Sequence, residues 1–129
     1  MEDLALFPEK RISEADLPSL AVGWRKAGMS VVFADGCFDP VCADLVGQLR
    51  DAGGEGDVLV VGVYPDGETA KRLGPPHPLV EESGRVTILA AMEFVDAVAV
   101  IPDGNVKGLL AVLKPDRHVP VKESSILLK

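Results

Sequence analysis

The chain has 129 residues, with 20 acidic and 13 basic side chains and a formal net charge of −7 at pH 7. That length predicts one domain over residues 1–129, made of an N-terminal helical segment (1–29), an α/β core (30–121) and a tail (122–129). Two cysteines are too few for a disulfide framework, and no apolar run approaches the ~20 residues of a membrane span. No cleavable apolar stretch begins the chain, so we expect no signal peptide, no membrane association and a cytoplasmic protein.

The negative charge is concentrated in one stretch of the sequence. Between residues 31 and 69, Arg50 is the only base against eight acids, which gives this stretch a net charge of −7. A surface of that sign repels phosphates, so binding to nucleic acid is not expected.

The first half of the chain alternates helical and strand patterns. Ser13 and Asp16 have the spacing of a capping box, and the apolar residues that follow recur at helical spacing until Gly28. The run DVLVVGVY is apolar on both faces, which is typical of a strand in a parallel sheet covered by helices on each side. The expected order is a helix (14–27), a strand (30–34), a loop (36–40), a helix (41–52) and a strand (57–64).

The second half continues this alternation with weaker signals. Proline and glycine mark turns, and the apolar spacing marks two more helices. The expected order is a turn (65–67), a short polar segment, a proline-rich loop (74–78), a helix (82–93), a strand (95–101), a turn (102–104), a helix (106–113) and a strand (117–121). Strands that alternate with helices predict a Rossmann-like, three-layer α/β/α fold with a parallel sheet and right-handed connections.

Ligands of such sheets bind beyond the carboxyl ends of the strands, where the strand order reverses. The loop after the first strand, residues 35–44, is therefore the first candidate for a site. From residue 31 the sequence reads VVFADGCFDPVCADLVGQL. This segment resembles the cytidylyltransferase-like nucleotidylyltransferases, which carry His-x-Gly-His after the first strand. It is most similar to their heptose-1-phosphate adenylyltransferase domain, where Gly-Cys-Phe-Asp precedes that signature.

Further pieces carry the resemblance over roughly residues 10–118. They are Val61-Gly62-Val63-x-x-Asp66, Pro78-Leu79-Val80, Arg85 with residues 88–92, Val95-Asp96-x-Val98 and Leu113-Lys114-Pro115-Asp116. The resemblance implies transfer of a nucleotidyl group from ATP or CTP to a phosphorylated sugar or alcohol, with Mg²⁺ and release of pyrophosphate. It places nucleotide-binding positions at Gly36, Cys37, Phe38, Asp39, Cys42, Asp44, Leu45 and Arg85, with Lys71 near the family's loop lysine.

The chain departs from the family where the chemistry lies. His-x-Gly-His is replaced by Cys42-Ala43-Asp44-Leu45, so both imidazoles are lost, and leucine cannot donate a hydrogen bond. A carboxylate ~5 Å from a phosphate charge repels it by about 3 kcal/mol, roughly a hundredfold in affinity. Asp35, where the family often has asparagine, adds to this repulsion. The family's C-terminal phosphate loop is also not found, and Lys122 could only partly replace the missing lysine.

These departures predict a catalytically inactive protein that binds nucleotide weakly or not at all. Such a chain would serve as a binding or assembly partner, for another protein or as a homodimer, with no cofactor and no catalytic residue. The alternatives are a working nucleotidyltransferase that uses Mg²⁺, and a generic α/β module.

Several of these residues have both a functional and a purely structural interpretation. Asp35, Asp39 and Asp44 could form a cation site, or Asp39 could cap a helix while Asp44 lies in its first turn. Arg85 could have the purely structural role of forming a salt bridge with Glu81, four residues earlier.

The cysteines and histidines also leave alternatives open. Cys37 and Cys42 could be a metal or redox pair, but buried inert thiols are expected, and no metal site is predicted. His77 is expected to be a solvated surface residue, and His118 a structural one. The apolar tail residues 126–128 could pack on the sheet or on a partner.

Overall fold

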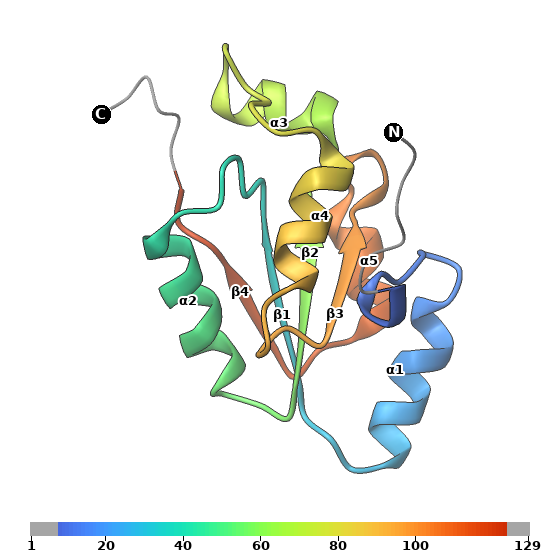
Figure 1. Ribbon diagram of the computed structural model, residues 1–129. Coiled ribbons are helices and arrows are strands. Elements are labelled where there is room, and N and C mark those ends of the chain that lie inside the picture. Colours follow the sequence, from blue (N-terminus) through green and yellow to red (C-terminus); the bar gives the residue numbers. More distant parts are fainter. Residues whose placement is uncertain (1–7, 124–129) are drawn as a thin grey trace.

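The computed structural model describes residues 8–123, which form a three-layer α/β/α domain (Figure 1). The predicted tail residues 126–128 lie outside this range. The helices are α1 (Leu17–Lys26), α2 (Ala43–Gly53), α3 (Asp66–Leu73), α4 (Glu82–Ala90) and α5 (Val106–Leu113), with short 3₁₀ turns η1 (Pro8–Lys10) and η2 (Pro102–Gly104). The strands are β1 (Val31–Gly36), β2 (Val58–Val63), β3 (Ala97–Val100) and β4 (Arg117–Pro120).

The four strands form one parallel sheet in the order β3-β2-β1-β4. The chain builds outward from β1 to β3 and then crosses back to place β4 on the other side of β1. The strand order therefore reverses between β1 and β4, which is where ligands of such sheets bind. The predicted Rossmann-like fold with a parallel sheet is confirmed.

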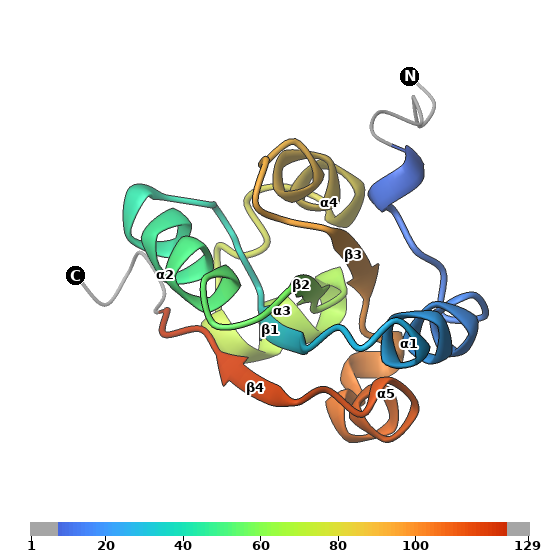
Figure 2. The same cartoon turned by 90° about the horizontal axis from the view of Figure 1, so that it is seen from below.

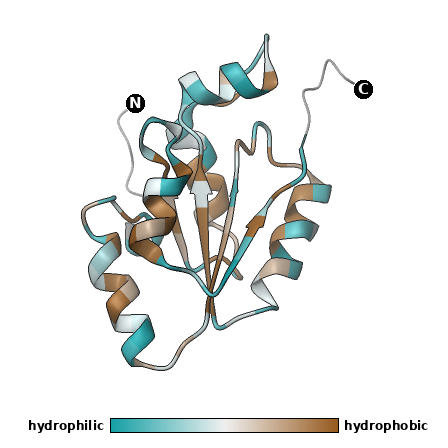
Figure 3. Cartoon of the chain, turned by 180° about the vertical axis from the view of Figure 1, so that it is seen from behind, coloured by the Kyte–Doolittle hydropathy of each residue, from teal (hydrophilic) through white to brown (hydrophobic). Residues whose placement is uncertain are grey.

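Both faces of the sheet are buried under helices, as the continuous apolar strands predicted. Along β1, Val32 and Ala34 belong to the core under α2 and α4, whereas Val31 and Phe33 belong to the core under α1 and α5. Figure 2 shows the two helix pairs on opposite sides of the sheet, and Figure 3 shows the apolar residues along the strands between them. No helix within residues 8–123 is long and apolar enough to cross a membrane.

Several elements differ from the sequence expectations: the helix expected over 82–93 ends at Ala90, and the strand expected over 95–101 spans only Ala97–Val100. The first helix begins at Leu17 rather than residue 14, although Ser13 Oγ does accept a hydrogen bond from the backbone N–H of Asp16 (3.3 Å). The polar segment after β2 is a helix, α3, in which Thr69 is the buried residue. Acidic residues in its first turn and basic residues in its last turn complement the helix dipole, so α3 forms without an apolar stripe.

The segment before α1 covers the outer edge of β3. Arg11 forms a parallel bridge with Val98, and the N–H of Ile12 donates to the carbonyl of Val98 (2.9 Å). Lys10 Nζ also reaches the carbonyl of Met92, at 2.8 Å. These contacts tie the N-terminal segment to the α/β core.

Candidate functional site

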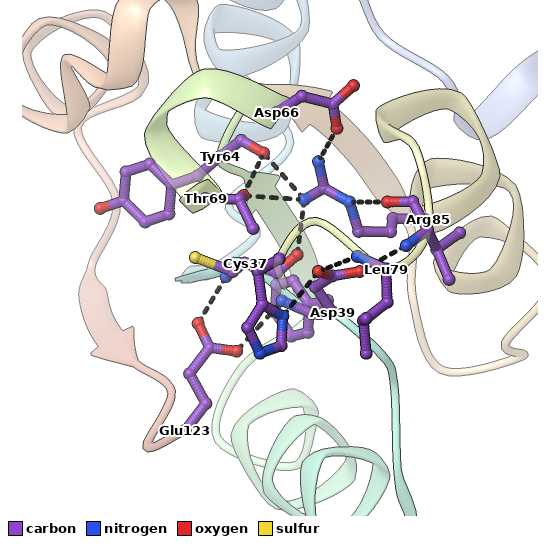
Figure 4. A network of polar contacts seen from close by, with 11 residues as sticks. Cys37, Asp39, Tyr64, Asp66, Thr69, Leu79, Arg85 and Glu123 are labelled. Atoms are coloured by element: carbon purple, nitrogen blue, oxygen red, sulfur yellow. Dashed lines mark hydrogen bonds and ion pairs between the residues drawn. The ribbon is translucent and has the colours of Figure 1, made fainter. Parts of the chain in front are cut away.

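The candidate site lies at the carboxyl ends of β1 and β4. Three pieces of chain meet there: residues 37–42, which connect β1 to α2; the first turn of α2; and residues 121–123, which follow β4. Figure 4 shows the polar contacts that join this region to the end of β2 and the start of α4.

The positions of the family signature lie at the start of α2. Cys42, in an extended conformation, is the residue that precedes the helix, and it is exposed. Asp44 is in the first turn, as predicted, and accepts a hydrogen bond from Gln48 Nε2 at 2.9 Å. Leu45 is only 3% exposed and packs in the core under α2 and α4. The start of α2 therefore presents a thiol and a carboxylate to solvent, and its leucine points inward.

Asp39 does not cap α2, contrary to one sequence interpretation. Its buried carboxylate accepts hydrogen bonds from the backbone N–H groups of Leu79 (2.5 Å) and Val80 (2.7 Å). It also contacts Nδ1 of His77 at 2.8 Å. The expectation that His77 is a solvated surface residue is wrong, because its side chain is buried against Asp39. Asp39 thus fastens the loop after β1 to the proline-rich loop before α4.

Asp35, near the end of β1, lies between Tyr64, which follows β2, and His118 of β4. Its carboxylate accepts a hydrogen bond from the Tyr64 hydroxyl (2.7 Å) and lies 2.6 Å from Nε2 of His118. Burial, and then the Asp35 carboxylate, raise the pKa of Tyr64. The structural interpretation of His118 agrees with this contact, since the ring joins β4 to β1.

The three acids Asp35, Asp39 and Asp44 do not converge on one point. Each carboxylate faces a different set of partners, as described above, and this geometry contradicts the alternative of a shared cation site. Within residues 8–123, no group of three or more His, Cys, Asp or Glu side chains is placed to hold a metal ion.

Arg85, from α4, is fully buried beneath the loop after β1. Its guanidinium donates to the carbonyls of Cys37 (2.6 Å), Tyr64 (2.8 Å) and Val80 (2.9 Å). It also donates to Thr69 Oγ1 at 3.3 Å and forms an ion pair with Asp66 at 2.7 Å. The side chain that pairs with Arg85 is therefore Asp66, not the Glu81 expected from helical spacing. Arg85 holds together three loops that border the site (Figure 4).

The two cysteines are free thiols in different environments. Cys37 is buried, and burial raises its pKa to about 11. Cys42 is exposed at the start of α2. Cys37 thus has the environment of an inert thiol, as expected. The expectation that Cys42 is also buried is wrong. Lys71 is exposed on the last turn of α3 and lines a shallow hollow with Pro65, Gly67, Glu68 and Asp103.

Sequence reasoning missed the acid that contacts the loop most directly. The carboxylate of Glu123 accepts hydrogen bonds from the backbone N–H groups of Cys37 (2.5 Å) and Phe38 (3.0 Å). Gly36 is the point of close approach, because a Cβ there would overlap the side chain of Val121. The only signal in the sequence was the position of Glu123 just after the last strand, next to the point where the strand order reverses.

No family model matches the chain. The chain resembles one part of a larger protein. It is 33% identical over 115 residues to the bifunctional protein HldE of Paramagnetospirillum magneticum, a match that covers 89% of this chain and 24% of the relative. It is 34% identical over 119 residues to the bifunctional protein HldE of Citrifermentans bemidjiense, covering 92% of this chain and again 24% of the relative.

A solved structure is similar as well. The lipopolysaccharide core biosynthesis protein of Thermoplasma volcanium superimposes with a TM-score of 0.64 at 28% identity, covering 70% of this chain and 73% of that one. Together these similarities show that the chain resembles one segment of the HldE proteins and has a fold similar to that of the solved structure. The chain spans about a quarter of the length of the HldE proteins it matches, 24% in both comparisons above.

Proposed function

We propose that this chain is a domain with a sugar-phosphate adenylyltransferase-like fold that does not transfer nucleotidyl groups and acts as a binding or assembly partner. The similarity to the HldE proteins supports the fold and the ancestry in this proposal. The loss of catalysis is argued from the residues at the start of α2.

The observation that carries the proposal is the set of side chains at the signature positions. During nucleotidyl transfer, negative charge grows on the phosphoryl oxygens, and enzymes stabilise it with placed donors and cations. Here Cys42 and Asp44 are the exposed groups, and Leu45 is buried in the core. The carboxylate of Asp44 would destabilise the charge that catalysis must stabilise.

Other acids reinforce this effect at the carboxyl edge of the sheet. Asp103 follows β3 and Glu123 follows β4 there, and neither belongs to the pieces that carry the family resemblance. At close range, carboxylates weaken the binding of a triphosphate by charge repulsion. Dissolved salt screens only part of this repulsion, even where the carboxylates are exposed.

The test is an assay of pyrophosphate release by the purified chain. It would contain Mg²⁺, either ATP or CTP, and a set of acceptors that includes sugar 1-phosphates and glycerol 3-phosphate. An HldE protein assayed in parallel provides the positive control. We expect no release above background from this chain, and steady release with any acceptor would overturn the proposal.

A second candidate function, a working nucleotidyltransferase that uses Mg²⁺, is favoured by one observation. The backbone N–H groups of Cys37 and Phe38 still converge on a single anionic group, as a phosphate-binding loop requires. In this case Cys37, Phe38 and the loop fastened by Arg85 would bind the nucleotide, and the same assay separates the two candidates.

The assembly role is tested by light scattering during size-exclusion chromatography. A homodimer would give about twice the chain mass of 13.6 kDa. A mass of one chain across the accessible concentration range would exclude self-association and leave a different protein as the partner.

A further inference from the structure

We infer that Glu123 is an internal occupant of the anion-binding loop after β1, and that residues 121–123 form a strap that excludes phosphate groups from it. This inference rests on the proposed function and deepens it, because it names what prevents a phosphorylated ligand from binding.

The contacts of Glu123 resemble those of a bound anion. Successive backbone N–H groups form an anion-binding concavity where one residue is in the left-handed conformation. Phe38 has a φ of 54°, which is unusual for a residue other than glycine, and it is fully buried. The N–H groups of Cys37 and Phe38 donate to the two oxygens of the Glu123 carboxylate. The carboxylate therefore occupies the place that a phosphate oxygen would need.

The strap is fastened on both sides of the β1 loop. The N–H of Val121 donates to the carbonyl of Asp35 at 2.9 Å, which extends the pairing of β4 with β1. The side chain of Gln48, on α2, accepts from the N–H of Lys122 (2.8 Å) and donates to its carbonyl (2.9 Å). These contacts hold the backbone of the strap directly before Glu123.

The loop retains features that attract an anion. Arg85 lies beneath it and donates to the carbonyl of Cys37, so a buried cation is close to the anion-binding N–H groups. Glu123 supplies the negative charge that such a site favours. A phosphate group would have to displace this carboxylate and would also meet Asp44 at the start of α2.

The experiment follows the amide signals of Cys37 and Phe38 by NMR while inorganic phosphate is added. Glu123→Gln removes the charge and keeps the size of the side chain. We expect saturable shifts of both amides in this variant, with an affinity for phosphate at least about tenfold higher than in the wild type. The matched control is Glu93→Gln, an exposed acid before the amino end of β3, which should behave like the wild type.

A second variant, Gln48→Ala, tests the strap without changing the charge of Glu123. It should also raise the affinity for phosphate, by less than Glu123→Gln does, because the carboxylate can still compete. If the folded variants bind phosphate no better than the wild type, or if the wild type already binds it as tightly, the inference is wrong. The inference is also wrong if releasing the strap unfolds the chain, because the segment is then required for the stability of the fold. These outcomes are independent of pyrophosphate release, so they do not depend on the test of the proposed function.

Discussion

At the scale of single residues, Cys37 shows how burial changes the chemistry of a side chain. Its side chain is buried in the core under α1 and α5, and this burial raises the pKa of the thiol from 9.0 to about 11. At neutral pH Cys37 therefore stays protonated and is a poor nucleophile, because the thiolate is the reactive form. Cys42, by contrast, is exposed at the start of α2.

The raised pKa of Cys37 predicts a loss of stability at alkaline pH. The folded chain holds this proton more tightly than the unfolded chain, so the stabilisation is complete below pH 9 and is lost as the pH rises to about 11. We expect the free energy of unfolding, measured by urea denaturation, to fall over this range, and to fall less in Cys37→Ala. The control is Cys42→Ala, which removes a thiol at an exposed position and leaves the contribution of Cys37 in place. The pKa of Tyr64 is also raised, which leaves part of the slope in every variant.

At the scale of elements, the buried guanidinium of Arg85 joins the end of β1, the end of β2 and the start of α4. Replacing it with methionine would leave the carbonyls of Cys37, Tyr64 and Val80 buried without this donor. We expect Arg85→Met to destabilise the chain by about 3–5 kcal/mol in urea denaturation. Arg50→Met, at an exposed position on α2, should change the stability by less than about 0.5 kcal/mol. A small effect of Arg85→Met would contradict this role.

The start of α2 predicts how far the lost signature can be restored. Cys42 and Asp44 are exposed, so Cys42→His with Asp44→Gly should be tolerated and should raise the affinity for ATP by about tenfold. Adding Leu45→His places a polar ring in an apolar core and should cost about 2–4 kcal/mol of stability. Calorimetry with Mg²⁺-ATP measures the first effect, and thermal unfolding measures the second. Unchanged binding in the double variant would show that the obstacle lies elsewhere, with Glu123 as the first candidate.

The elements that could be predicted are those with a clear signal in their own local sequence. The apolar runs of β1 and β2 and the four-residue spacing in α2 are local signals, and these elements were predicted to within about two residues at each end. The helix α3 has no apolar stripe, so the rule that identified the other helices could not detect it.

The parts of the site that were missed depend on contacts between distant residues. His77 is buried because Asp39, 38 positions earlier, lies against it. Glu123 reaches N–H groups 85 and 86 positions away in the sequence. A single sequence indicates which loops meet at the carboxyl edge of the sheet, but not which side chains in those loops form bonds.

At the scale of the whole molecule, we expect the charge of the carboxyl edge to decide which ligands can bind. We expect ATP and CTP, with Mg²⁺ present, to bind in the millimolar range or not at all. The reasons are the acidic groups around the β1 loop and the occupation of its N–H groups by Glu123. Calorimetry measures this directly, and adenosine serves as the uncharged comparison. Micromolar affinity for either nucleotide would contradict the repulsion argument.

The two edges of the sheet bear on how copies of this chain meet one another. On one side, Arg11 and Ile12 already bond to Val98, so the outer backbone of β3 is covered there. On the other side, β4 has four residues and includes Arg117 and Pro120, and both residue types discourage strand addition. Stacking of strands from molecule to molecule is therefore disfavoured along either edge, which guards against fibre growth. A partner would have to dock against the helices or the loops instead.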